Sequence, residues 1–334
     1  MKAALRSVAL FAALGTSTAL AEPAQIRFAS PAPPMSQVNT WGLVPWTEEV
    51  QKASNGAVEF KFFAGPSLGT FNNIMDRTVT QVVDASFGTF GPMGDHFKKT
   101  SVSELPFEGE NCTEASIALW RLIASGLIAD EFTHIKPLAV FTFPPGGYHA
   151  KKPIRVADDL KGVKIATFTR VASDQANLLG AVPVTMTPSD AYQAVQRGLA
   201  SAISVGWTAF MPFKYYEVTN FHLDAQQGQG GAYVVMNKDV YAKIPANARA
   251  AVDGLSYESF TRRMGQNSDK METEFRGAVS HMPGHTVERL APAEAASWKR
   301  ILVPITEEWV KSTPNGATVL AAYRAEIAAV RAGK

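Results

Sequence analysis

The chain has 334 residues, of which 32 are Lys or Arg and 30 are Asp or Glu, and 46% of its residues are hydrophobic. This length and composition provide enough apolar residues for about two packed domains and argue against a largely disordered protein. The balanced charge gives no reason to expect nucleic acid as a partner, and the one cysteine, Cys112, excludes an internal disulfide and a multi-cysteine metal site.

The first twenty-one residues have the pattern of a secretory signal peptide. Lys2 and Arg6 precede an apolar run at residues 8–14, and Ala-Leu-Ala at residues 19–21 supplies the small residues that signal peptidase reads. The apolar run is shorter than the roughly 20 residues that a membrane-spanning helix needs. We therefore expect cleavage after Ala21 and a soluble mature protein in the periplasm.

The first half of the mature chain alternates short strand-like runs with amphipathic helical stretches. Strands are expected at residues 26–29, 58–63, 82–87 and 136–142, and helices around residues 41–50 and at residues 113–123, with Thr113 as a candidate N-cap.

The second half continues in the same style and then changes. Strands are expected at residues 163–166, 182–184 and 200–205, and helices at residues 171–179 and 188–196. Residues 246–276 lack strand signals and predict one long helix, which is followed by helical stretches at about 293–311 and 317–331. The alternation predicts α/β sheets covered by helices on both faces.

Two turn-rich segments are candidate crossings between lobes. They are Phe-Pro-Pro-Gly-Gly at residues 143–147 and Gln-Gly-Gln-Gly-Gly at residues 227–231, and they flank a compact α/β block at about 148–229. This layout predicts a hinged, two-lobed protein in which one lobe is inserted into the other.

Gly-Pro-Ser-Leu-Gly at residues 65–69 matches the nucleophile-elbow pattern, so an exported hydrolase that uses Ser67 is one hypothesis. Only two predicted strands precede Ser67, and no His-Gly-Gly oxyanion segment lies upstream of it. Pro66 also removes a backbone donor beside the serine. A structural turn is the favoured interpretation.

His281 and His285 have a zinc-like spacing. Pro283 and Gly284 lie between them and would break the helix that places both imidazoles on one face. We therefore expect a surface loop there, and no metal or cofactor in the protein.

Aromatic residues gather at or just after the expected strand ends, where open α/β sheets form their ligand crevice. Arg170 follows the strand expected at residues 163–166 among hydroxyl-bearing residues, and it is either a clamp for a ligand carboxylate or a solvated surface residue. The predicted ligand site consists of Phe71, Thr89, Phe90, Tyr148, Phe168, Arg170 and Trp207.

An ordered series of short motifs resembles the substrate-binding subunits of tripartite ATP-independent periplasmic (TRAP) transporters. Asp-Leu-Lys-Gly-Val-Lys-Ile at residues 159–165 is similar to the segment that opens the second lobe in that family. Phe-Phe-Ala-Gly-Pro-Ser-Leu-Gly at residues 62–69 and Glu-Leu-Pro-Phe at residues 104–107 follow the first lobe, and Leu-Gly-Ala-Val-Pro-Val at residues 179–184 comes later. The series covers about residues 26–270, and in it Ser67 falls in a turn.

The resemblance implies an α/β, two-lobed periplasmic binding protein fold with a ligand cleft between the lobes and a long helix that spans both. Residues 22–147 and about 230–275 would form lobe I, and residues 148–229 and 276–334 would form lobe II. The resemblance also implies capture of a small organic solute, usually a carboxylate, closure by a hinge motion, and delivery to a TRAP membrane permease.

The ligand pocket is expected to depart from the family. Ala166 stands where typical members carry their carboxylate-clamping arginine, and Ile-Ser-Val-Gly-Trp at residues 203–207 replaces a Gln-x-Asn-Pro-like turn. We therefore expect Arg170 to supply the missing cation, and the aromatic residues to favour a flat, apolar or aromatic carboxylate over a sugar acid or dicarboxylate. The alternative is that loss of the clamp leaves a neutral or amine ligand.

Three functions stay open on the sequence. The first is a monomeric, transport-coupled binding protein for a small organic acid, with no catalysis. The second is the exported serine hydrolase that uses Ser67. The third is a ligand-sensing module of a membrane receptor, which would share the fold and differ only in its partner.

Overall fold

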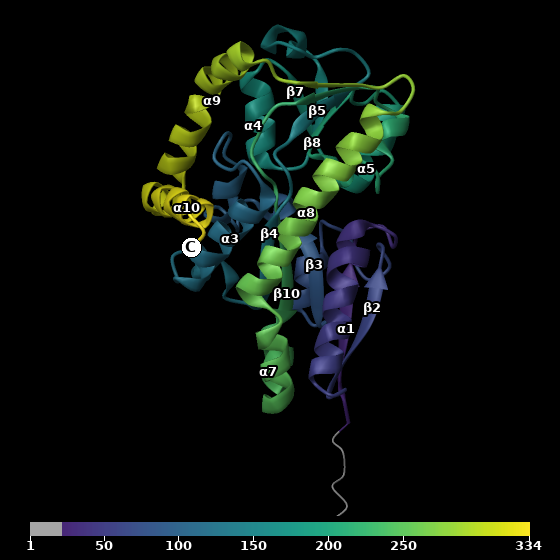
Figure 1. Cartoon of the computed structure of the whole chain (residues 1–334), viewed down its shortest axis with the longest axis vertical. Helices are drawn as coiled ribbons and strands as arrows, with labels where there is room; N and C mark the ends of the chain where they lie inside the picture. Colours follow the sequence, from purple (N-terminus) through teal and green to yellow (C-terminus); the bar gives the residue numbers. More distant parts are fainter. Residues whose placement is uncertain (1–21) are drawn as a thin grey trace, which may run out of the picture.

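Two β-sheets divide residues 22–334, the part of the chain that the computed structural model describes, into two lobes (Figure 1). The predicted signal peptide, residues 1–21, lies outside the described residues. The order of the elements and their division between two sheets confirm the predicted α/β, two-lobed fold.

The first sheet has the strand order β2-β1-β3-β10-β4, with β10 antiparallel to its neighbours and β1, β2 and β3 parallel. Its strands are β1 (Ala24–Ser30), β2 (Val58–Ala64), β3 (Ala85–Thr89), β4 (Ile135–Thr142) and β10 (Gly231–Asn237). The helices of this lobe are α1 (Val44–Ala53), α2 (Ile74–Val79), α3 (Cys112–Ala124), α6 (Lys238–Lys243) and α7 (Ala246–Gly254). β10 is not among the strands expected from the sequence, because all of its residues are buried and it therefore lacks a polar–apolar alternation.

The second sheet has the strand order β11-β9-β5-β8-β6-β7. Its strands are β5 (Gly147–Ala150), β6 (Lys164–Thr167), β7 (Val182–Thr185), β8 (Ala202–Val205), β9 (Phe221–Asp224) and β11 (Thr286–Arg289). β5 is antiparallel to β8 and β9, whereas the remaining pairs are parallel. Helices α4 (Arg170–Leu178) and α5 (Pro188–Gln196) follow β6 and β7 in the chain.

The chain passes between the sheets at both of the turn-rich segments that the sequence singled out. Residues 143–146 connect β4 to β5, and residues 225–230 connect β9 to β10. Helix α8 (Tyr257–Ser280) is a third link and runs from beside β10 towards the second lobe (Figure 1). Its Met264 packs in the core of the first lobe, and its Met271 packs in the core of the second.

The single long helix expected at residues 246–276 is wrong, because the chain breaks between α7 and α8. Gly254 ends α7, and Ser256 is extended, with φ −109° and ψ −164°. Trp46 holds the break in place: its indole N–H donates to the Leu255 carbonyl oxygen at 2.8 Å, and its ring stacks on Phe260. The break satisfies a buried indole donor that a continuous helix would leave without this acceptor.

Thr113 is not the N-cap of α3, contrary to expectation. The N-cap is Asn111, whose side-chain oxygen accepts the Glu114 N–H at 2.9 Å. Thr113 instead lies inside the first turn, where its N–H and that of Cys112 donate to the Asp269 carboxylate on α8. Asn111 is extended, which is the backbone conformation that an N-cap requires.

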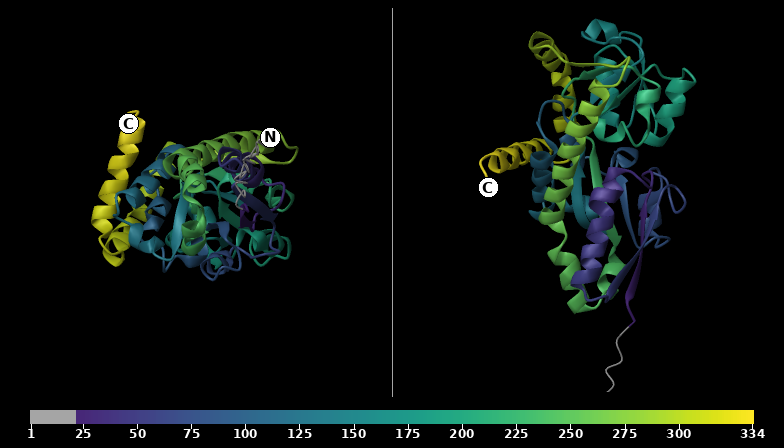
Figure 2. Two further views of the ribbon diagram at one scale, coloured as in Figure 1. Left: turned by 90° about the horizontal axis from the view of Figure 1, so that it is seen from below. Right: turned by 45° about the vertical axis from the view of Figure 1, so that its right-hand side comes forward.

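The last two helices, α9 (Pro292–Ser312) and α10 (Gly316–Arg331), lie along one side of the molecule (Figure 2). Helix α9 packs on α4 of the second lobe, whereas α10 packs on α3 of the first. From the sequence, all of residues 276–334 are expected in the second lobe. Arg331 holds α10 in place through paired hydrogen bonds of 2.7 Å to the Glu114 carboxylate.

Candidate ligand-binding site

A pocket lies between the lobes, and we call it the interlobe pocket. Its walls come from the loop after β1, the end of β3, both crossing segments, the start of α4 and the residues after β8. The cavity has a volume of about 140 Å³. A cavity of about 150 Å³ holds a benzene ring, so the pocket has room for a small ligand with a single ring.

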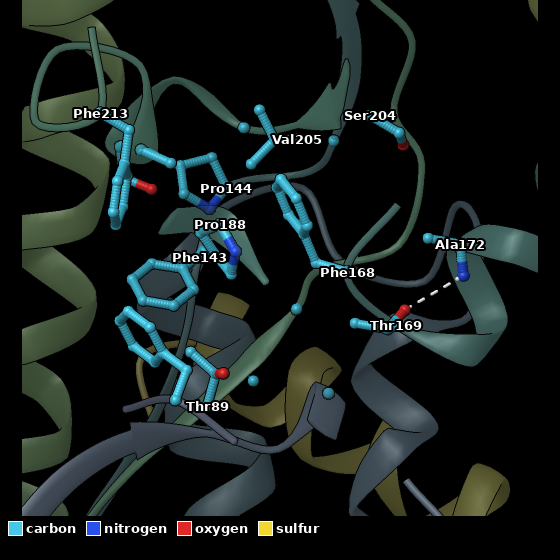
Figure 3. A pocket seen from close by; sticks show the side chains of 18 of the residues that line it. Thr89, Phe143, Pro144, Phe168, Thr169, Ala172, Pro188, Ser204, Val205 and Phe213 are labelled. Carbon is cyan, nitrogen blue, oxygen red and sulfur yellow. Dashed lines mark hydrogen bonds between the residues drawn. The ribbon is translucent and has the colours of Figure 1, made fainter. Parts of the chain in front are cut away.

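Phenyl rings from five different segments form most of the apolar wall. They belong to Phe71, Phe87, Phe143, Phe168 and Phe213. Phe71 meets the Phe87 ring edge-on at a centroid distance of 6.2 Å and lies 6.5 Å from the Phe213 ring. Figure 3 shows Phe143, Phe168 and Phe213 around the pocket, together with the rings of Pro144 and Pro188. Such a lining favours a flat, largely apolar ligand.

Three long polar side chains line another part of the pocket: Glu104, Gln175 and Gln227, which we call the polar end. The Gln175 side-chain amide donates to the backbone carbonyl of Glu104 at 3.2 Å, which ties lobe II to lobe I. The Ser204 hydroxyl donates to Oε1 of Gln227 at 2.8 Å. Oε1 of Gln175 and Nε2 of Gln227 are buried and have no hydrogen-bond partner within the described residues.

The chain approaches itself closely at the polar end. A Cβ on Gly228 would lie 1.6 Å from the Glu104 carbonyl oxygen, so only glycine fits beside Glu104 there. This close approach fixes the neighbouring Gln227 next to Glu104.

The polar end carries an acid and no cation. None of the described residues that line the interlobe pocket is Lys or Arg. Burial raises the pKa of Glu104 to about 7, and a hydrogen bond from Thr169 opposes that rise. The pocket therefore contains a carboxyl group that keeps its proton to a higher pH than an ordinary glutamate does.

The structure places three of the seven predicted site residues in the pocket lining: Phe71, Thr89 and Phe168. Phe90 is 2% exposed and packs against Phe97 in the core. Tyr148 is fully buried, with its ring edge-on to Trp298.

Trp207 also lies outside the lining, although Gly206 and Thr208 on either side of it are part of the wall. Its indole N–H donates to the Asp224 carboxylate at 2.8 Å, and its ring packs on His149. These contacts hold the ring in the core of the second lobe and away from the ligand space.

Arg170 is the first residue of α4, and its side chain is 77% exposed. It faces a neighbouring outer groove, where it lies 3.7 Å from the Asp95 carboxylate and 3.8 Å from that of Asp174. Arg170 is absent from the lining of the interlobe pocket. Ala166, where the family's arginine is expected, is buried in β6. The clamp role of Arg170 stays a prediction.

Phe143, Phe213, Glu104, Gln175 and Gln227 are not among the site residues expected from the sequence. Phe143 and Gln227 lie in the two turn-rich crossing segments, and crossings border the cleft of a two-lobed protein. Their position in these segments is therefore a signal in the sequence that indicates the site. Phe213 and Gln175 carried none, because only the packing of α4 and of the turn after β8 directs them inward.

Ser67 lies in an exposed turn between β2 and α2, outside the interlobe pocket. The described residues include no group of three or more His, Cys, Asp or Glu side chains arranged to hold a metal. Nor does any helix within residues 22–334 have the length and apolar character needed to cross a membrane.

The comparisons with known proteins agree with this architecture. Residues 29–313 match the family model of the bacterial extracellular solute-binding proteins, family 7. The chain is 27% identical to the "Outer membrane transporter protein TsaT" of Comamonas testosteroni, over 89% of this chain and 90% of that protein. It is 26% identical to the C4-dicarboxylate-binding periplasmic protein DctP of Rhodobacter capsulatus, over 93% of each chain.

Two solved structures resemble it with a TM-score of 0.87 and 26% identity. One is a TRAP solute-binding protein of Rhodoferax ferrireducens in complex with benzoate, matched over 91% of this chain and 97% of that one. The other is a TRAP solute-binding protein from a marine metagenome in complex with 3-hydroxybenzoate, matched over 91% and 98%. The chain belongs to the bacterial extracellular solute-binding proteins of family 7 and is a substrate-binding subunit of the TRAP type.

Proposed function

We propose that this protein captures a small, flat, largely apolar organic acid in the periplasm and delivers it to a TRAP membrane permease. The observation that carries the proposal is the wall of five phenyl rings around a cavity of about 140 Å³, which suits a ligand with a single ring. Benzoate and its hydroxylated relatives are flat acids with a single ring.

The similar structures support the same ligand class. The Rhodoferax protein holds benzoate, and the metagenome protein is described as specific for aromatic acid ligands. A dicarboxylate or a sugar acid fits less well, because the described lining offers no cation for a second carboxylate and few groups for many hydroxyls.

A neutral or amine ligand is the second candidate, and the polar end is the observation that favours it. Glu104 is an acid inside a pocket without Lys or Arg among its described lining residues. An ionised Glu104 would attract an ammonium group.

The proposal includes a binding role without catalysis, a monomeric protein and a mature N-terminus at Glu22. The exposed turn around Ser67, outside the pocket, supports a structural role for that serine. Release of the ligand requires the lobes to part at the two crossings and α8.

A thermal-shift panel on residues 22–334 tests the ligand class. We expect benzoate, 3-hydroxybenzoate and mandelate to stabilise the protein, by about 2.7 kcal/mol at 100 times the dissociation constant. Succinate, glucuronate and pyroglutamate should have little effect. Stabilisation by these acids alone, or by benzylamine and no acid, would contradict the proposal.

A further inference from the structure

The polar end of the interlobe pocket contains a buried side-chain donor that has no hydrogen-bond partner among the described residues. Nε2 of Gln227 is a buried donor without a partner in the described structure, and it belongs to the same wall as the Glu104 side chain. A buried amide without a partner costs about 1–3 kcal/mol, so a ligand group that accepts a hydrogen bond from it would recover this cost.

We propose that Glu104 recognises the ligand carboxylate as a neutral carboxylic acid, donating its own proton in the hydrogen bond, while the Gln227 amide donates a second one. This inference rests on the proposed function, since it concerns how the same pocket holds an acid. In this mechanism, two neutral hydrogen-bond donors take the place of the cationic clamp that is expected from the family.

The surroundings of Glu104 favour the protonated form. Helices α3 and α10 pack on the turn that carries Glu104, and their charged side chains, Glu114, Arg121, Arg324, Glu326 and Arg331, are all held in ion pairs. The outer groove beside Glu104 carries Asp95, Lys98, Arg170, Asp174 and Glu308. All five are exposed to solvent in the outer groove and include two cations against three acids, so none supplies a buried counter-charge. Burial raises the pKa of Glu104 to about 7. The carboxyl group can therefore hold its proton at periplasmic pH near neutrality.

Ligand binding is then coupled to a proton. Below pH 7 Glu104 already carries the proton that it donates. Above pH 7 the ionised Glu104 would repel the ligand anion, so binding has to draw one proton from solvent. The proton stays on Glu104 and no covalent bond of the ligand changes.

Isothermal titration with 3-hydroxybenzoate at pH 6 and pH 8 tests this mechanism in wild type, Glu104→Gln and Glu308→Gln. With a pKa of about 7 for Glu104, wild-type affinity should be about tenfold weaker at pH 8, with uptake of close to one proton in buffers of different ionisation enthalpy. Glu104→Gln keeps a neutral donor, so it should bind within about threefold of wild type at pH 6 and equally well at pH 8. Glu308→Gln, an exposed acid of the outer groove, should follow wild type.

Other outcomes of these titrations would overturn the inference alone or the inference together with the proposed function. Wild-type affinity that does not depend on pH, or a Glu104→Gln variant that keeps the pH dependence, overturns the inference and leaves the proposed function standing. No binding of 3-hydroxybenzoate or benzoate at either pH overturns both. Binding of benzylamine that strengthens at pH 8 and is lost in Glu104→Gln also overturns both, because Glu104 then holds a cation. If Glu104→Gln does not fold, the wild-type pH profile and proton uptake still decide.

Discussion

The backbone carbonyl of Phe168 lies against Gly91, so closely that a Cβ on Gly91 would come within 2.3 Å of the oxygen. Gly91 follows β3 in lobe I and Phe168 follows β6 in lobe II, so this contact joins the lobes over the pocket that both residues line. Any side chain larger than hydrogen would hold the lobes apart there.

Gly91→Ala should therefore weaken ligand binding by about tenfold or more, because a methyl group forced against a backbone oxygen costs about 1–3 kcal/mol. The matched control is Gly94→Ala, whose Cβ would have its nearest neighbour at 3.7 Å. Titration of both variants with benzoate checks this. Equal affinity in the two would show that the contact does not contribute to closure.

Phe143→Ala should lower affinity for aromatic acids by about tenfold to a hundredfold, since a ring in the crossing segment loses its contact with the ligand. Phe107 is a suitable control because it is similarly half-buried but lies outside the interlobe pocket. Titration of Phe107→Ala should give the wild-type dissociation constant. A ligand that binds Phe143→Ala with the wild-type dissociation constant would have to bind outside the interlobe pocket.

Arg170→Ala should leave affinity within about twofold of wild type. The side chain is 77% exposed and its ion pairs with Asp95 and Asp174 are long and solvated, and such pairs contribute about 0–1 kcal/mol. The measurement is again the dissociation constant for benzoate. A loss of tenfold or more in Arg170→Ala, partly restored in Arg170→Lys, would instead establish Arg170 as the clamp that the sequence suggested.

Arg331→Ala should destabilise the protein by about 1–2 kcal/mol, because it leaves the buried Glu114 carboxylate without its guanidinium partner. Burial alone would raise the pKa of Glu114, but Arg331 and the Glu110 N–H outweigh it and hold that pKa below its ordinary value. An acid of this kind contributes stability above its unfolded pKa and loses it as pH falls.

The destabilisation should therefore be seen at pH 7 in a urea or thermal melt and should shrink as the pH is lowered towards 4. Arg300→Ala, an exposed arginine of α9, is the control and should melt like wild type. An Arg331→Ala variant as stable as the control would mean that α10 does not depend on this ion pair.

Three histidines form a hydrogen-bonded row in the second lobe. His149 contacts the Val205 carbonyl through Nε2 at 3.0 Å, so that nitrogen carries a proton and Nδ1 accepts. His222 then donates from Nδ1 to His149, and His285 donates from Nδ1 to Nε2 of His222. Burial lowers the pKa of His149 to about 4 and that of His222 to about 2. Both rings are neutral in the folded protein at pH 5.

In the unfolded chain these histidines take up protons near pH 6.5, so each should remove about 2 kcal/mol of stability between pH 7.5 and pH 5. Glu104 has the opposite effect on the pH dependence of stability, because its pKa is raised in the folded protein and it therefore adds stability as the pH falls. The informative quantity is therefore the difference between wild type and His149→Gln in how the free energy of unfolding depends on pH. As the pH falls, the stability of His149→Gln should decrease less steeply, by the slope that corresponds to uptake of about one proton. The exposed His281→Gln should match wild type, and an unchanged slope in His149→Gln would refute the neutral row.

Most of the fold followed from local patterns in the sequence. Helix α5 occupies the residues expected for it, since a proline at its start and amphipathic spacing mark both ends. β10 and the break before α8 did not follow. A strand buried on both faces has no alternation, and the break depends on Trp46, more than two hundred residues away in the chain.

The site was harder to foresee for a related reason. A strand end indicates that a residue is near the crevice, as it did for Phe71 and Phe168, but not which way its side chain turns. Trp207 turns inward because Asp224 accepts its indole N–H, and Arg170 turns outward towards Asp95. Asp224 lies 17 residues from Trp207 and Asp95 lies 75 residues from Arg170 in the chain, so the tertiary structure brings these partners together.

The most direct test of the central claim is the crystal structure of residues 22–334 grown with 3-hydroxybenzoate. The account predicts the aromatic ring between Phe143, Phe168 and Phe213, with the ligand carboxylate within hydrogen-bond distance of the side chains of Glu104 and Gln227. A ligand carboxylate bound to Arg170 in the outer groove, or an interlobe pocket that holds only water at saturating ligand, would contradict it.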